Sequence, residues 1–169
     1  EIIQFLPDTN LAIHKQLQQV ISARQSMLKN QDSKVIAREF PKGAAIFGSA
    51  CQTCHGPDGN GIKGLAPPLN KSEWVNGNKD KLISIVLLGL SGPVQVNGHL
   101  YQAPEINGEM PGIGYSKDYS DEDVTQLLNF IRRSWQNNSV IIDPANITEV
   151  RQKLKGRGKA FTVEELKGM

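Results

Sequence analysis

Several residue types on which small proteins often depend are scarce in this chain. Its 169 residues include two cysteines, three histidines and three methionines, and aromatic residues make up 6% of the total. An excess of charge of one sign is also missing, because 19 basic and 17 acidic side chains give a net charge of +2. Without a basic stripe, nucleic acid is not an expected partner. No apolar run approaches membrane-spanning length, so we expect no transmembrane segment in this sequence.

Glycine, in contrast, is plentiful, with 16 residues, and it is concentrated between Gly56 and Gly114. A long loop-rich stretch with few apolar side chains would struggle to form a core unaided. A large buried apolar group would solve this problem, because it would supply the missing hydrophobic surface. The composition thus agrees with a domain built around a bound cofactor.

One stretch of the chain carries a specific chemical signature. In Cys51-Gln52-Thr53-Cys54-His55, two cysteines stand at i and i+3, and a histidine directly follows the second. This is the attachment pattern of c-type haem, in which each thiol adds to a vinyl group of the haem and the histidine becomes the proximal iron ligand. The sequence therefore predicts one covalent haem c, attached through Cys51 and Cys54, with His55 on the iron.

Two other kinds of site use cysteines at this spacing. A structural zinc site needs four ligands, but only His14 and His99 remain, and they lie far from the pair on either side. A thioredoxin-like redox motif follows a strand, whereas residues 43–50 are rich in small side chains and predict a short helix. Haem attachment is therefore the preferred interpretation.

The chain divides into three parts. We expect residues 1–40 to be an N-terminal helical extension or the tail of a preceding domain, residues 41–137 to form the haem domain, and residues 138–169 to form a C-terminal extension. The first part predicts a helix over residues 10–29, capped by Asn10 and followed by a polar break. Its apolar residues at helical spacing are Ile13, Leu17, Val20, Ile21 and Leu28.

Within the haem domain, helices are predicted over residues 41–54 and 79–90 and again after Ser120, which caps a turn of acidic residues. The Asn-Gly pair within residues 94–101 predicts a small β-hairpin. A short helix is predicted near residues 145–154. The side chains expected to face the core are Leu82, Ile83, Val86, Leu87, Val124, Leu127, Leu128, Ile131 and Trp135.

The order of these parts resembles the class I cytochrome c family, which has a first helix, the haem motif, a proline loop, a middle helix, a methionine loop and a last helix. The resemblance covers residues 41–137. In that family a glycine and an aromatic residue of the first helix cross an aromatic residue of the last, and Gly43, Phe47 and Phe130 match them. The resemblance implies an all-α cytochrome c fold, with helices around one haem, a small β-hairpin insertion and helical extensions at both ends.

Three phrases are also similar to cytochrome c domains attached to bacterial quinoprotein-type dehydrogenases. They are Ala66-Pro67-Pro68-Leu69, Glu73-Trp74-Val75 and Gly108-Glu109-Met110-Pro111-Gly112. This similarity implies a dehydrogenase as the electron donor.

Met110 is the expected sixth ligand of the iron. It follows His55 by 55 positions (110 − 55), in a loop bracketed by glycine and proline that can carry its sulfur back across the haem. A thioether is a soft, neutral ligand that favours ferrous iron. Two alternatives stay open: Met110 packs on the core, or His99 beside the Asn-Gly turn is the ligand.

The resemblance implies roles for three neighbours of the iron ligands. Pro67 matches the family proline whose carbonyl accepts a hydrogen bond from the second ring nitrogen of the axial histidine, with Pro68 as the other candidate. Trp74 and Tyr101 are expected to cover the haem edge or to hydrogen-bond a propionate, and plain packing is the alternative for both.

These features predict an electron carrier rather than an enzyme, one that passes single electrons from a dehydrogenase towards a cytochrome or an oxidase. The alternatives are a peroxidase-like enzyme or gas-binding sensor with an open sixth position, and an interaction unit whose haem is vestigial. Haem of this kind is attached outside the bacterial inner membrane. We therefore expect a periplasmic or otherwise exported protein. Any membrane tether would lie in parts of the full-length protein outside this sequence.

Overall fold

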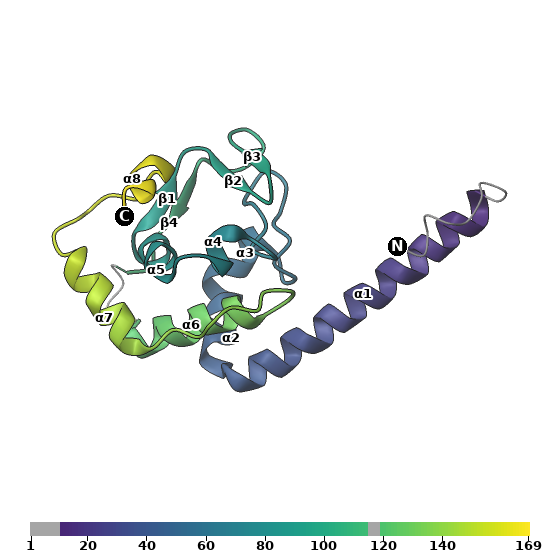
Figure 1. Cartoon of the computed structure of the whole chain (residues 1–169), viewed down its shortest axis with the longest axis horizontal. Helices are drawn as coiled ribbons and strands as arrows, with labels where there is room; N and C mark the ends of the chain where they lie inside the picture. Colours follow the sequence, from purple (N-terminus) through teal and green to yellow (C-terminus); the bar gives the residue numbers. More distant parts are fainter. Residues whose placement is uncertain (1–10, 115–118) are drawn as a thin grey trace.

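The computed structural model describes residues 11–114 and 119–169, without the side chains of residues 11, 12, 26 and 28–32. These residues are mostly helical and include two antiparallel pairs of short strands (Figure 1). The expectation of an all-α fold with one hairpin is therefore too narrow, because the second strand pair was not predicted. That second pair contains Met110.

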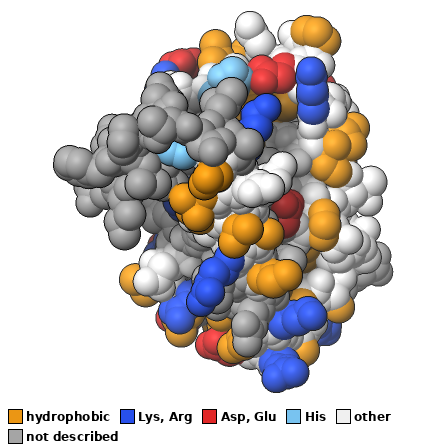
Figure 2. All heavy atoms as spheres, turned by 90° about the vertical axis from the view of Figure 1, so that its right-hand side faces the viewer, with side chains coloured by type: hydrophobic (Ala, Val, Ile, Leu, Met, Phe, Trp, Pro, Cys, Tyr) orange, Lys and Arg blue, Asp and Glu red, His pale blue; other side chains and the backbone are white. Residues whose placement is uncertain are grey.

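The first helix, α1 (Leu11–Glu39), extends away from the rest of the described chain (Figure 1). It is longer than the predicted helix, and the polar break expected near residues 30–33 is absent. Among its described side chains, Ile36 and Ala37 pack against the main core, which is the larger of two buried hydrophobic clusters, whereas apolar side chains such as Val20 are exposed. Asn10, the predicted cap, lies outside the described residues. From the side on which α1 projects, hydrophobic groups lie separately among charged ones (Figure 2).

None of the described helices is both long and apolar enough to cross a bilayer.

A continuous helical segment leads to the cysteine motif, as predicted for residues 41–54. It consists of α2 (Pro41–Ile46), the π-helical turn η2 (Phe47–Cys51) and α3 (Gln52–His55). Helix α2 crosses α6 (Asp121–Arg133) at Gly43, where any larger residue would collide with the backbone of α6. Beside the crossing, the rings of Phe47 and Phe130 lie with centroids 5.5 Å apart, and Trp135 packs on both. The crossing of Gly43, Phe47 and Phe130 is thus confirmed.

The end of α6 is tied to the loop that precedes α4 (Glu73–Asn76) by one buried amide. The carboxamide oxygen of Asn137 accepts from the backbone N–H of Lys71 at 2.8 Å and from the amide of Asn76 at 2.9 Å. Its nitrogen donates to the carbonyls of Leu69 at 3.2 Å and Ile131 at 2.9 Å. Since these partners come from two distant segments, Asn137 fixes the loop against α6.

The middle helix, α5 (Lys79–Leu88), begins at Asn78, whose side chain accepts from two backbone N–H groups, and ends at Gly89. Its buried apolar side chains belong to the main core. All nine predicted core side chains are buried, namely Leu82, Ile83, Val86, Leu87, Val124, Leu127, Leu128, Ile131 and Trp135.

Two strand pairs follow α5. The predicted hairpin is present as β2 (Val94–Val96) and β3 (His99–Tyr101), joined through Asn97 and Gly98, which both have positive φ. The second pair joins β1 (Gly89–Ser91) to β4 (Glu109–Pro111), and Leu90 lies opposite Met110.

The C-terminal part, residues 138–169, packs against the elements described above. It contains α7 (Pro144–Lys153) and α8 (Val163–Lys167), which lie on the side of α5 away from α1 (Figure 1). Ile147, Val150 and Leu166 are buried in the main core. Residues 138–169 thus share one core with the haem domain, while their description as an extension of a domain over 41–137 stays a prediction.

Candidate haem site

The two cysteines of the motif lie about one helical turn apart, Cys51 at the end of η2 and Cys54 in α3. Neither is in a disulfide bond; Cys54 is exposed, and Cys51 is partly buried against the main core. Burial, together with neighbouring Cys54, raises the pKa of Cys51 to about 11.

The alternative of a zinc site finds no further ligands. Over residues 11–114 and 119–169, no three His, Cys, Asp or Glu side chains gather closely enough to hold a metal ion. The segment before the motif is a helix rather than a strand, so the setting also differs from that of a thioredoxin-like motif.

His55 is buried and oriented by one hydrogen bond. Its Nδ1 lies 3.0 Å from the carbonyl oxygen of Pro67. Because a carbonyl only accepts, Nδ1 carries the hydrogen and Nε2 keeps a free lone pair. The predicted hydrogen bond to Pro67, rather than to Pro68, is thereby confirmed.

Burial also sets the charge of this ring. It lowers the pKa of His55 below the usual histidine value, and the hydrogen bond to Pro67 offsets the effect only in part. The neutral imidazole with a free Nε2 is the form that ligates a metal.

The loop that brings Pro67 to His55 depends on a glycine whose role sequence reasoning missed. Gly61 has a positive φ of 76°, and a Cβ there would lie 2.5 Å from the carbonyl oxygen of Ala66. Its N–H donates to the carbonyl of His55 at 2.9 Å. The sequence shows Gly61 in a turn cluster, but the close approach to Ala66 becomes visible only in the folded loop.

Met110 is held in a strand, not in the open loop that was predicted. Its partly buried side chain packs against the main core. Beyond it, the N–H groups of Ile113 and Gly114 donate to the carbonyls of Val86 and Leu87 at 2.9 and 2.7 Å. The Met110 segment is therefore fastened to β1 and to the end of α5.

Trp74 and Tyr101 both pack around the hairpin. The indole N–H of Trp74 donates to the carbonyl of Gln95 at 2.9 Å, so its only donor is engaged within the protein. Tyr101 is partly buried on a small cluster formed with Val94 and Val96. These contacts favour the packing role for Trp74 over a hydrogen bond to a propionate.

His99, the alternative iron ligand, is engaged elsewhere. Its Nε2 lies 2.9 Å from Oε1 of Glu105, and 57% of its side chain is exposed. Its ring also meets that of Tyr101 edge to face, with centroids 4.5 Å apart. The exposure and the engagement of Nε2 with a carboxylate do not favour His99 as an iron ligand.

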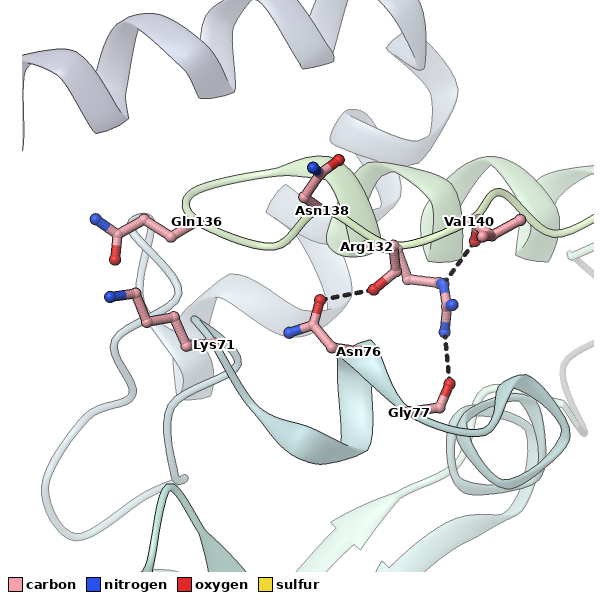
Figure 3. A pocket seen from close by; sticks show the side chains of 8 residues that line it. Lys71, Asn76, Gly77, Arg132, Gln136, Asn138 and Val140 are labelled. Carbon is pink, nitrogen blue, oxygen red and sulfur yellow. Dashed lines mark hydrogen bonds between the residues drawn. The ribbon is translucent and has the colours of Figure 1, made fainter.

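A hollow of about 660 Å³ lies beside the end of α6, and its lining contains none of the predicted haem residues (Figure 3). Arg132, on its wall, is buried, and burial lowers the pKa of its guanidinium. This group donates to backbone carbonyls, those of Val140 at 3.0 Å and Val75 at 2.8 Å. Arg132 therefore joins three chain segments and has a structural role.

The donor set of the motif fits a haem c. The two thiols stand one helical turn apart, the residue after the second is a buried neutral imidazole with a free Nε2, and a thioether is available at Met110. Thiols that add to vinyl groups, an imidazole and a thioether are the groups that c-type haem uses.

Comparison with known proteins agrees with this chemistry. Residues 40–135 match the Cytochrome c family. Cytochrome c-552 of Thermus thermophilus is 33% identical over 129 residues, which cover 74% of this chain and 81% of that protein.

Two dehydrogenase subunits are also similar. The cytochrome c subunit of the quinone alcohol dehydrogenase of Gluconacetobacter polyoxogenes is 29% identical over 111 residues, covering 64% of this chain and 22% of the subunit. The gluconate 2-dehydrogenase cytochrome c subunit of Pantoea cypripedii is 34% identical over 99 residues, covering 57% and 21%. Each match thus spans about a fifth of the subunit.

The family match and the paired thiols of Cys51 and Cys54 together identify the cofactor as one covalently bound haem c. The chain belongs to the cytochrome c family.

Proposed function

We propose that this chain carries single electrons from a dehydrogenase towards a downstream respiratory acceptor, with its haem iron held between His55 and Met110. The observation that carries the proposal is the state of His55. The ring is buried and neutral, its Nδ1–H donates to the carbonyl of Pro67, and its Nε2 is free. In the sequence, His55 directly follows the second attachment cysteine. Such a histidine is prepared to bind iron on one face of a haem.

The proposed sixth ligand explains why the protein would transfer electrons rather than bind a substrate. When bound, the haem supplies a one-electron couple, and a thioether opposite the imidazole favours its ferrous form. Met110 would close the second axial position, because its segment is paired with β1 and fastened to α5. The residues around the ligands then hold geometry and exclude water.

The donor is proposed from the relatives. Two of them are cytochrome c subunits of an alcohol dehydrogenase and of a gluconate dehydrogenase. By that likeness, a dehydrogenase subunit would deliver electrons to the haem edge, and a cytochrome or an oxidase would accept them. We place this activity in the periplasm or another exported compartment, since c-type haem is attached outside the bacterial inner membrane. The carrying unit is assigned to residues 41–137.

The experiment replaces Met110 in the matured holoprotein. The ferric wild type should show the far-red band of a sulfur–iron bond, and Met110→Ala should abolish it. Met27→Ala is the matched control, because Met27 lies on α1 and is 72% exposed. A band that survives in Met110→Ala, or that disappears in Met27→Ala, would contradict the assignment.

A further inference from the structure

We propose that residues 138–169 act as a brace on the Met110 strand, with Arg151 and Phe161 as positioning residues that keep the methionine on the iron. This inference rests on the proposed ligation by Met110. It assigns to the C-terminal part a role in the site rather than a role as a linker.

The first contact of the brace is a fork of hydrogen bonds from Arg151 on α7. Its Nε donates to Oδ1 of Asp121 at 2.7 Å, its Nη1 to the carbonyl of Gly114 at 3.0 Å, and its Nη2 to the carbonyl of Tyr119 at 3.0 Å. Gly114 follows Met110 by four residues, and Tyr119 directly precedes the cap of α6. One guanidinium therefore joins the segment after Met110 to the start of α6.

The second contact is made by the backbone of Phe161. Its N–H donates to the carbonyl of Gly89 at 3.0 Å, and its carbonyl accepts from the N–H of Ser91 at 2.7 Å. The opposite edge of β1 pairs with β4, where Leu90 faces Met110. Strand β1 is therefore bonded on both edges, to the Met110 strand on one side and to Phe161 on the other.

The side chain of Phe161 anchors this contact. It is 4% exposed and belongs to the main core. The guanidinium of Arg157 lies over its ring, with Cζ 3.9 Å from the centroid, and also donates to both carboxylate oxygens of Glu165 at 2.9 Å. Because α8 begins two residues later, the segment is held from both directions.

These contacts matter because β4 is short and its pairing with β1 spans only three residues. A pair of three-residue strands is at best marginally stable by itself. Segments with few contacts open locally long before the whole protein unfolds. An opening of β4 would carry Met110 away from the iron and leave that position free for another ligand. Arg151 and Phe161 oppose this opening without touching the iron.

The test is a titration of the ferric holoprotein with imidazole, which competes with the methionine for the iron. Loss of the far-red band is the signal that is measured. We expect Arg151→Gln to bind imidazole about tenfold more tightly than the wild type, since the fork contributes a few charge-assisted hydrogen bonds. Arg151→Lys keeps the charge but loses the fork, so its affinity should lie between those two.

A matched variant distinguishes a global loss of stability from a specific effect on the Met110 strand. Asn137→Ala removes four hydrogen bonds, none of them to β1 or β4. It should lower the denaturation midpoint at least as much as Arg151→Gln while leaving imidazole affinity unchanged. Equal affinity in Arg151→Gln and the wild type would overturn the brace, and so would equal tightening in Asn137→Ala.

Amide hydrogen exchange gives a readout that does not depend on the iron. Arg151→Gln should speed exchange at residues 89–91 and 109–114 more than in α2. Exchange that is unchanged there means that the brace is absent, whatever ligates the iron. If the wild type lacks the far-red band, Met110 is not the ligand, and the proposed positioning of Met110 by Arg151 and Phe161 fails with it. This holds even if hydrogen exchange shows that the C-terminal part stabilises the strand.

Discussion

Gly43 on α2 lies directly against Gln126 on α6: a Cβ at Gly43 would fall 2.0 Å from the backbone carbonyl oxygen of Gln126. A backbone atom cannot move aside as a flexible side chain can. The two helices can therefore approach this closely only while residue 43 is glycine, and the approach places Phe47 against Phe130 and leads the chain into the cysteine motif.

Gly43→Ala should destabilise the holoprotein by about 3 kcal/mol, because the added methyl forces the two helices apart. Guanidinium denaturation followed by circular dichroism measures the effect. Gly48→Ala, five residues further along, is the control, since its Cβ meets only a side-chain atom at 3.9 Å. We expect that control to be neutral or slightly stabilising. Similar losses in both variants would show that the crossing is not the cause.

Asn137→Ala should cost about 3 kcal/mol, because it removes a buried amide and leaves several backbone groups without their partner. Chemical denaturation again gives the value. The neighbouring Asn138 is exposed, and Asn138→Ala should leave stability within about 0.5 kcal/mol of the wild type. If Asn137→Ala unfolds with the same free energy as the wild type, the loop before α4 is fixed by other contacts.

Asp123 gives the protein an acid-dependent contribution to stability. The ion pair with Lys42, whose Nζ lies 2.5 Å from Oδ1, is the main reason that the pKa of Asp123 lies below its usual range, and hydrogen bonds from Ser120 add to the effect. A depressed carboxyl pKa stabilises the fold fully above the unfolded value of about 4 and loses that contribution as the pH falls through the folded value.

The wild type should therefore be more stable than Asp123→Asn at pH 7, and the difference should shrink as the pH falls below about 4. Unfolding free energies measured from pH 7 to pH 2.5 check this. In a Lys42→Gln background the same substitution should have a smaller effect. A difference that is constant across the pH range would contradict the role of this ion pair.

His99→Ala should leave the haem spectrum and the far-red band unchanged, because Nε2 of His99 pairs with Glu105 at the surface. Absorption spectra of the ferric and ferrous protein suffice as the measurement. A shifted spectrum in His99→Ala, together with an unaffected Met110→Ala, would make His99 the ligand.

The sequence predicted those features that depend on neighbouring residues. The Asn97-Gly98 pair predicted the hairpin, and Ser120 with its acidic turn predicted the start of α6. The cysteine motif predicted the covalent haem. The resemblance to class I cytochromes c, rather than hydrophobic periodicity, supplied the match of Gly43 to the helix crossing. Local chemistry was sufficient wherever the partners lie within a few residues.

Contacts between distant segments were missed. The strand at Met110 exists because β1, twenty residues earlier (110 − 90), offers an edge to it, and Arg151 reaches Gly114 across 37 residues. Helix α1 continues through its polar residues, and no hydrophobic periodicity marks that continuation. Single-sequence patterns do not encode such pairings, since they depend on which surfaces meet after folding.

The most direct test of the account is carbon monoxide binding to the reduced, unmodified holoprotein, because a carrier with both axial positions occupied has no place for the gas. Rapid mixing followed at the Soret band should show no adduct in the wild type and a fast one in Met110→Ala. Fast binding of carbon monoxide to the wild type would contradict the closed coordination and favour an enzyme or a gas sensor.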